Sequence, residues 1–264
     1  MAGFRIDLQP PIVQAAFAVL PKAIPYRWMH YALQHLTQTD SPRDAYLSSM
    51  TMEVLWLNRW HLRHCFDHVG VELLDPDEPY VFTSLHFGHW GMYPASLYQQ
   101  FGIPSQMVAT GRNQDRSTPR GRFWYRYGHL RQYLSGFECC YSTDGVFALA
   151  ARLREGRSLT VISDVREKGL IQREAAVDFL GGPFYLQRTV AALARRGRVR
   201  IVPYVGYYDE SLHRHRVTWF APQSPLRNDV ATMQRIVATL EPTVMGKEAF
   251  YFNVMDALRR PLPQ

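Results

Sequence analysis

The chain has few cysteines and no long apolar run. Three cysteines, Cys65, Cys139 and Cys140, occur in 264 residues. An odd number with one adjacent pair argues against a disulfide framework or a zinc site, so we expect a reducing compartment. No window reaches the roughly 18 continuous apolar residues of a membrane span. The apolar stretch 11–20 is followed by prolines rather than by a cleavage site of small residues, so we expect neither a signal peptide nor an anchor.

Repeats, low-complexity tracts and long linkers are also missing from the sequence. Apolar residues make up 47% of the chain, which is enough for a full core. We therefore predict one domain over residues 1–264, with N-terminal helices in 1–70 and an α/β core in 71–264. Thirty basic and 23 acidic residues give a net charge of +7. This balance favours anionic partners: membrane headgroups, coenzyme A phosphates, an acidic carrier protein or nucleic acid.

Apolar runs alternate with helical patterns along the chain. The patterns predict strands at 81–85, 105–110, 137–142, 158–164, 176–180, 199–208 and 215–221. They predict helices at 26–36, 43–68, 91–101, 118–133, 144–155, 186–196, 229–240 and 247–260. This order predicts an α/β fold, with a central, mostly parallel or mixed sheet of about seven strands and helices on both faces. The polar turn at 209–211 predicts an antiparallel pair at the edge of the sheet.

A histidine follows the first buried strand of the predicted core. It is His86, within Ser84-Leu85-His86-Phe87-Gly88-His89-Trp90-Gly91, where glycines permit a tight turn and the ring is well placed for general-base work. The stretch resembles the His-x4-acid motif, usually His-Phe-Gly-Asn-Trp-Glu, of the late acyltransferases of lipid A biosynthesis and their relatives. Gly91 stands where that motif has its acid.

The resemblance extends over about residues 10 to 260 through short blocks in the same order. Residues 108–113 resemble the family's strand and Arg-containing loop, 177–183 its Val-Pro-Phe-Phe-Gly-x-Pro segment, and 201–205 its Val-Pro-Val-Phe strand. It implies a glycerol-3-phosphate acyltransferase-like fold and acyl transfer. Residues 248–253 lack the histidine of the family's Trp-x-His-Arg-Arg-like tail, which favours a specialised acceptor over a lipid A precursor.

The missing motif acid raises the question of what orients His86. Asp164 ends the predicted strand 158–164 in a block that resembles the family's second motif. Because parallel neighbouring strands bring their carboxyl ends together, we expect Asp164 to reach His86, with Glu167 in reserve. The alternative is that Asp164 caps a turn or pairs with Arg166.

We expect the substrate to contact residues around these two. A guanidinium binds oxyanions without a proton change, so Arg112 is a candidate for clamping a phosphate or polarising the thioester oxygen, with an exposed loop arginine as the alternative. Backbone amides near Gly88 are candidate charge stabilisers. His89 is one turn from His86, but no third ligand is near in the sequence, so we expect a structural role or a substrate contact and no metal. The predicted substrate-binding set is Gly88, His89, Arg112, Asn113, Arg166 and Glu167.

The segment 112–131 holds six arginines and one acid among aromatic residues. This mixture suits peripheral contact with a membrane or contact with the acyl donor. The alternatives are a solvated helix and RNA stacking, and we expect no nucleic-acid partner.

The combined prediction is an acyltransferase that uses an acyl-CoA or acyl-carrier-protein thioester as donor and binds no permanent cofactor. The acceptor is a hydroxyl or an amine, and the absence of an acid at Gly91 favours an amine. Two alternatives stay open: a catalytically impaired module that binds acyl chains or a carrier protein, and a thioesterase in which His86 activates water. The expected location is the cytoplasm, either free or peripheral on the cytoplasmic face of the inner membrane.

Overall fold

The computed structural model describes residues 59–88, 90–109, 138–165, 174–209, 211–212 and 214–246. The predicted helices at 26–36, 118–133 and 247–260, and most of the one at 43–68, lie outside these ranges.

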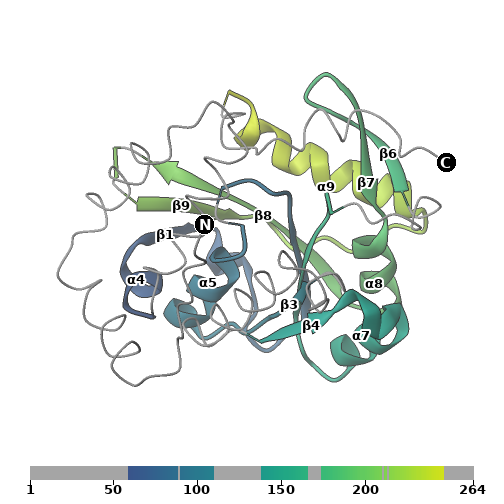
Figure 1. Ribbon diagram of the computed structural model, residues 1–264, viewed down its shortest axis with the longest axis horizontal. Coiled ribbons are helices and arrows are strands. Elements are labelled where there is room, and N and C mark those ends of the chain that lie inside the picture. Colours follow the sequence, from purple (N-terminus) through teal and green to yellow (C-terminus); the bar gives the residue numbers. More distant parts are fainter. Residues whose placement is uncertain are drawn as a thin grey trace, which may run out of the picture.

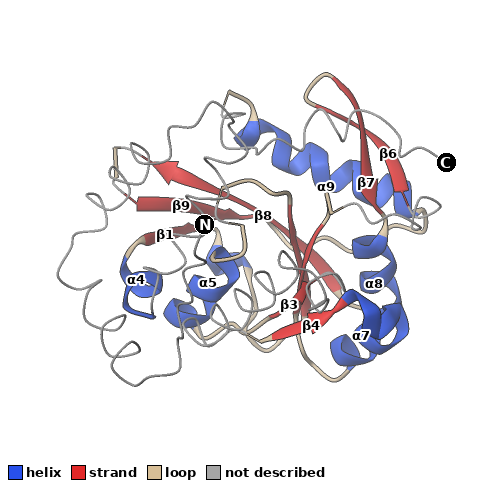
Figure 2. Cartoon of the chain, in the orientation of Figure 1, coloured by secondary structure: helices blue, strands red, loops and turns tan. Residues whose placement is uncertain are grey.

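A seven-stranded mixed sheet forms the centre of the described part of the chain (Figures 1 and 2). The strand order is β1-β9-β8-β2-β5-β3-β4, and each neighbouring pair is parallel except β8–β9. The predicted fold class is therefore confirmed. The strands are β1 (Phe66–Val69), β2 (Tyr80–Ser84), β3 (Gln106–Ala109), β4 (Cys139–Tyr141), β5 (Leu159–Ile162), β8 (Arg200–Asp209) and β9 (Arg214–Trp219).

Helices pack on both faces of this sheet. Successive strand residues point to opposite faces, and Val81 and Phe82 accordingly belong to two separate apolar clusters. The Phe82 cluster includes residues of α4 (Arg59–His64) and α5 (Tyr93–Phe101). The Val81 cluster includes residues of α7 (Gly145–Arg154), α8 (Thr189–Gly197) and α9 (Asp229–Val244). Short 3-10 turns occur at Val71–Leu73 (η1) and Ser142–Asp144 (η3).

A separate hairpin lies beside α9 (Figure 1). It pairs β6 (Glu174–Phe179) with β7 (Gly182–Gln187) through a two-residue turn in which Leu180 and Gly181 have φ of 49° and 72°, the geometry that tight hairpins require. The sequence pattern missed β7 and began the next helix at residue 186, but α8 begins at Thr189. The run 181–183, Gly-Gly-Pro, is typical of a turn, but here only Gly181 lies in the turn, and Gly182 and Pro183 open the strand β7.

The N-terminal edge of the sheet corrects two further predictions. The helix predicted over 43–68 ends at His64, and Phe66 to Val69 form β1. His68 therefore lies in a strand and not in the predicted helix. Since β1 pairs in parallel with β9, the antiparallel pair β8–β9 is present as predicted but does not form the edge of the sheet. Around these residues the apolar positions fit both a helical period and a strand period. The pairing of β1 with β9 favours the strand.

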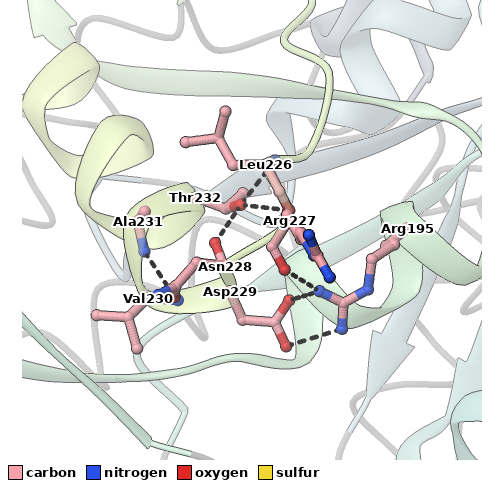
Figure 3. Close-up of polar contacts among 8 residues, drawn as sticks. All are labelled: Arg195, Leu226, Arg227, Asn228, Asp229, Val230, Ala231 and Thr232. Atoms are coloured by element: carbon pink, nitrogen blue, oxygen red, sulfur yellow. Dashed lines mark hydrogen bonds and ion pairs between the residues drawn. The ribbon is translucent and has the colours of Figure 1, made fainter.

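The start of α9 shows how α8 and α9 are joined (Figure 3). The Asn228 side chain caps α9 by accepting hydrogen bonds from the N–H groups of Val230 (2.8 Å) and Ala231 (3.3 Å). Arg195 of α8 donates to both carboxylate oxygens of Asp229 and to the carbonyl of Arg227. A bidentate guanidinium–carboxylate pair fixes the relative position of the two helices.

Two further observations concern the described residues. None of their helices is both long and apolar enough to cross a membrane.

The thiols of Cys65 and Cys140 are free and buried, and burial raises the pKa of each to about 12. Because the thiolate is the nucleophile, these two cysteines are chemically inert at neutral pH.

Candidate active site

His86 lies just beyond the carboxyl end of β2, a strand in which every residue is buried. Its side chain is 23% exposed, so the ring is at the rim of the core rather than inside it. Trp90 lies against the ring edge to face, with centroids 4.7 Å apart. The imidazole of His86 thus lies at the carboxyl edge of the sheet, where ligands of α/β proteins bind.

Asp164 lies at the same level on the neighbouring strand. In the parallel pairing of β2 with β5, Ser84 is opposite Ile162, so His86 and Asp164 each stand two residues beyond the last pair. The His86 Nδ1 and the Asp164 Oδ1 are 2.7 Å apart. The second carboxylate oxygen, Oδ2, accepts a hydrogen bond of 2.9 Å from the backbone N–H of His86. The structure therefore brings together the two residues that the sequence assigned to catalysis.

This contact decides the protonation pattern of the ring. A carboxylate only accepts hydrogen bonds, so Nδ1 carries the proton and Nε2 keeps its lone pair. Within the described residues, no group hydrogen-bonds to His86 Nε2. The Asp164 side chain is fully buried, which holds the carboxylate in one orientation. An imidazole arranged in this way can take a proton through Nε2.

Hydroxyl groups beneath the pair hold the two strand ends together. Thr83 Oγ1 donates to the Val161 carbonyl at 2.9 Å and lies 2.7 Å from Ser163 Oγ. The backbone N–H of Ser163 donates to the Ser84 carbonyl at 3.0 Å. Thr83 and Ser163 did not stand out in the sequence, because hydroxyl residues at strand ends are common. The only signal that the sequence offers is that Thr83 lies three residues before His86 and Ser163 lies directly before Asp164.

The turn after His86 depends on Gly88. Its φ is 57°, a conformation that residues with a side chain rarely adopt. A Cβ at this position would lie 2.2 Å from the Tyr93 hydroxyl and 2.3 Å from the Gly206 carbonyl oxygen. The loop is held further by the Tyr204 hydroxyl, which donates to the Trp90 carbonyl at 2.9 Å. Gly88 is therefore required to fold the motif closely against β8.

The remaining predicted site residues fall into two groups. Gly91 is buried and has no side chain to orient the imidazole. Among the described residues, the carboxylate that is hydrogen-bonded to His86 is that of Asp164. The predicted substrate contacts His89, Arg112, Asn113, Arg166 and Glu167 lie outside the described residues. In the ranges that the structure covers, no group of three or more His, Cys, Asp or Glu residues could hold a metal ion.

Comparison with known proteins gives a family match and similarities to solved structures. Residues 45–259 match the model of a family described as bacterial lipid A biosynthesis acyltransferase. No curated protein sequence matches the chain. Among solved structures, the 1-acyl-sn-glycerophosphate (LPA) acyltransferase PlsC from Thermotoga maritima is similar at 10% sequence identity with a TM-score of 0.44. That similarity covers 89% of this chain and 96% of the other.

Proposed function

The chain belongs to the bacterial lipid A biosynthesis acyltransferase family, and on this premise we propose that His86 is the general base of its acyl transfer. Membership makes the chain an acyltransferase. The proposed donor is an acyl-CoA or acyl-carrier-protein thioester, and the proposed acceptor is a hydroxyl or an amine. The observation that carries the assignment of the base is the 2.7 Å contact between His86 Nδ1 and Asp164 Oδ1.

The reaction needs one proton acceptor that later becomes a donor. His86 Nε2 removes the proton of the acceptor hydroxyl or amine. At the same time the oxygen or nitrogen of the acceptor forms a bond to the carbonyl carbon of the thioester. The tetrahedral intermediate then expels the sulfur, the carbon–sulfur bond breaks, and the imidazolium returns the proton to the leaving thiolate. A positioned base of this kind contributes about 10²- to 10⁴-fold to the rate.

Asp164 takes the role that the motif acid has in the resembled family. It holds the Nδ1–H tautomer and stabilises the imidazolium that forms during attack. The sequence favoured an amine acceptor because Gly91 left His86 without an acid. With Asp164 on the ring, that reason no longer applies, and a hydroxyl acceptor receives the same base assistance. The contact also argues against a module that has lost its catalytic pair.

Substrate contacts complete the proposal. Backbone amides near Gly88 would face the developing oxyanion, and Arg112 with Asn113 would meet the donor's phosphates or the thioester oxygen. His89, Arg166 and Glu167 would contact the acceptor or donor from the same edge. The net charge of +7 suits an anionic donor, and peripheral contact of segment 112–131 with the cytoplasmic face of the inner membrane is part of the proposal.

The test is a transfer assay with the full chain. Radiolabelled lauroyl-CoA or lauroyl-carrier protein is offered with octyl glucoside as a hydroxyl acceptor or octylamine as an amine acceptor, and product masses are recorded. We expect an acylated acceptor from the wild type, a loss of about 10²- to 10⁴-fold in His86→Ala, and full activity in His64→Ala, which removes an exposed histidine. Absence of transfer, or transfer that survives His86→Ala, would refute the proposal. Free fatty acid released equally with and without acceptor would identify a thioesterase instead.

A further inference from the structure

Gln187 is a buried glutamine whose side chain has no hydrogen-bond partner among the residues that the structure describes. It is the last residue of β7, and Arg188 alone separates it from the start of α8 at Thr189. It is 6% exposed, and neither the nitrogen nor the oxygen of its carboxamide has a partner in the part of the chain that the structure describes. Burying an unpaired amide costs about 1–3 kcal/mol by protein mutational data. Native proteins rarely keep such a group without a reason.

The position of Gln187 connects it to the proposed catalytic pair. Its backbone N–H donates to the carbonyl of Ser163 at 3.0 Å, and Ser163 directly precedes Asp164. β7 therefore ends beside the strand end that carries the carboxylate of the pair. Ser84 Oγ, at the end of β2, is another buried polar atom without a partner in the described ranges. Ser84 therefore ends the strand that precedes His86, and Gln187 is hydrogen-bonded through its backbone to the residue that precedes Asp164.

A second buried glutamine shows that this condition is not general in the protein. Gln106 begins β3, at the opposite end of the strands, and is 8% exposed. Its Nε2 donates to Glu138, and its Oε1 accepts from Arg152 at 3.2 Å. At the amino end of the strands a buried carboxamide is satisfied by protein groups. At the carboxyl end, the buried carboxamide of Gln187 has no such partner among the described residues.

We propose that Gln187 binds a substrate group that both donates and accepts hydrogen bonds, an amide or a hydroxyl, beside His86 and Asp164. The carboxamide offers two donors on Nε2 and an acceptor on Oε1, so a ligand that matches both removes the penalty of burying it. Two sources have this chemistry in the proposed reaction: the amides of the donor's pantetheine arm and the hydroxyl or amine of the acceptor. The inference rests on the proposed acyl transfer and adds a substrate-positioning residue to it.

The proposal predicts opposite signs for stability and binding. In the free protein, Gln187→Met replaces an unsatisfied polar group by an apolar one of similar length, so we expect the melting temperature to stay equal or rise. Gln106→Met, the matched control, breaks two hydrogen bonds of the described residues and leaves Glu138 and Arg152 without this partner. We expect a lower melting temperature for the control and unchanged substrate binding.

Binding is measured without catalysis, so that a failure of the proposed reaction does not hide the result. The probe is the non-reactive thioether S-dodecyl-CoA, titrated calorimetrically into wild type, Gln187→Met, Gln106→Met and His86→Ala. Loss of a matched amide contact weakens binding by about 10- to 100-fold. Such a loss in Gln187→Met alone assigns the residue to the donor. If the thioether binds normally, a 10- to 100-fold rise in KM for octyl glucoside or octylamine assigns it to the acceptor.

Two results would overturn the proposal. One is a lower melting temperature for Gln187→Met, which would show that the carboxamide is satisfied within the free protein, for instance by a buried water. The other is unchanged thioether affinity together with unchanged KM for both acceptors.

Discussion

Two regions of the sheet hold a histidine that is hydrogen-bonded on its ring, yet only one of them is arranged to move a proton. At the carboxyl end of β2, His86 donates from Nδ1 to a buried carboxylate and is partly exposed. In β1, His68 accepts at Nδ1 from the indole N–H of Trp219 (2.8 Å), and its Nε2 lies 2.9 Å from Ser96 Oγ. Both nitrogens of His68 are therefore occupied by neutral partners.

The difference lies in what each environment does to the charged form of the ring. Burial without a negative partner lowers the pKa of His68 to about 3, so this ring stays neutral and acts as a hydrogen-bonding bridge between β1, β9 and α5. His86 instead has a negatively charged neighbour, the Asp164 carboxylate 2.7 Å from its Nδ1, which in the proposed reaction stabilises the imidazolium formed when the ring accepts a proton. In the proposed function, the feature that separates His86 from His68 is therefore the charge of the hydrogen-bond partner and not the hydrogen bond itself.

Exchanging each histidine for glutamine gives the largest separation between the two regions. We expect His86→Gln to lose about 10²- to 10⁴-fold in kcat with little change in melting temperature, because its ring is partly exposed. His68→Gln has the opposite effect: kcat within a few-fold of wild type, and unfolding easier by about 2–3 kcal/mol from the lost buried hydrogen bonds. Transfer kinetics and urea denaturation on the same preparations measure both. Equal loss of kcat in the two variants would remove the distinction.

The loop that carries the proposed site is expected to be more sensitive than other glycine positions. Gly88→Ala adds a Cβ only 2.2 Å from the Tyr93 hydroxyl, and Gly102→Ala adds one with nothing within 4 Å at a similar φ of 72°. The second variant should cost only the conformational penalty of about 1–2 kcal/mol. Gly88→Ala should cost more and also reduce kcat by displacing His86. Matching melting temperatures for the two variants would contradict the close packing of this turn.

The depressed pKa of His68 makes a prediction about acid stability. The unfolded chain takes up a proton near pH 6.5, whereas the folded ring does not until about pH 3. Stability therefore falls as the pH drops below 6.5, by up to about 1.4 kcal/mol per pH unit from this group. We expect His68→Gln to flatten the decline of the free energy of unfolding between pH 6.5 and 5, measured by urea denaturation at several pH values. An unchanged slope would show that the ring is protonated in the folded state.

The smallest expected effect on stability comes from a surface ion pair, Arg195 with Asp229. Arg195 is 41% exposed in its bidentate contact with Asp229 (Figure 3), and pairs of this kind contribute about 1 kcal/mol or less. Arg195→Ala should lower the melting temperature slightly, less so at 1 M salt, and leave kcat unchanged. A loss of activity comparable with that of His86→Gln would mean that kcat reports general stability rather than the proposed site.

Much of the fold follows from the sequence because buried parallel strands are unbroken apolar runs. β2 and β5 were predicted to within a few residues for this reason. β1 was missed because its strand character depends on β9, a partner far along the chain. β7 was missed because its first residues, Gly182 and Pro183, are typical of a turn, although they pair with Phe179 and Asp178 of β6. Local periodicity carries no information about such partners.

The candidate site likewise has parts that could be predicted from the sequence and parts that could not. His86 could be found from its motif, and Asp164 from the rule that parallel strands end at one edge. Their bidentate contact could not, because it depends on the register that places Ser84 opposite Ile162. Gln187 was hidden inside a predicted helix, and a missing hydrogen-bond partner becomes visible only in three dimensions.

The most direct test of the central claim, that Asp164 acts through His86, is a double-mutant cycle on kcat for acyl transfer with His86→Ala, Asp164→Asn and the double variant. Asp164→Asn loses the carboxylate that holds the Nδ1–H tautomer, so we expect each single variant to fall by about 10²- to 10⁴-fold. Because a residue that only orients the ring has nothing to orient once the ring is gone, the double variant should be no slower than His86→Ala. Losses that multiply would show that the two residues act independently and would contradict the account.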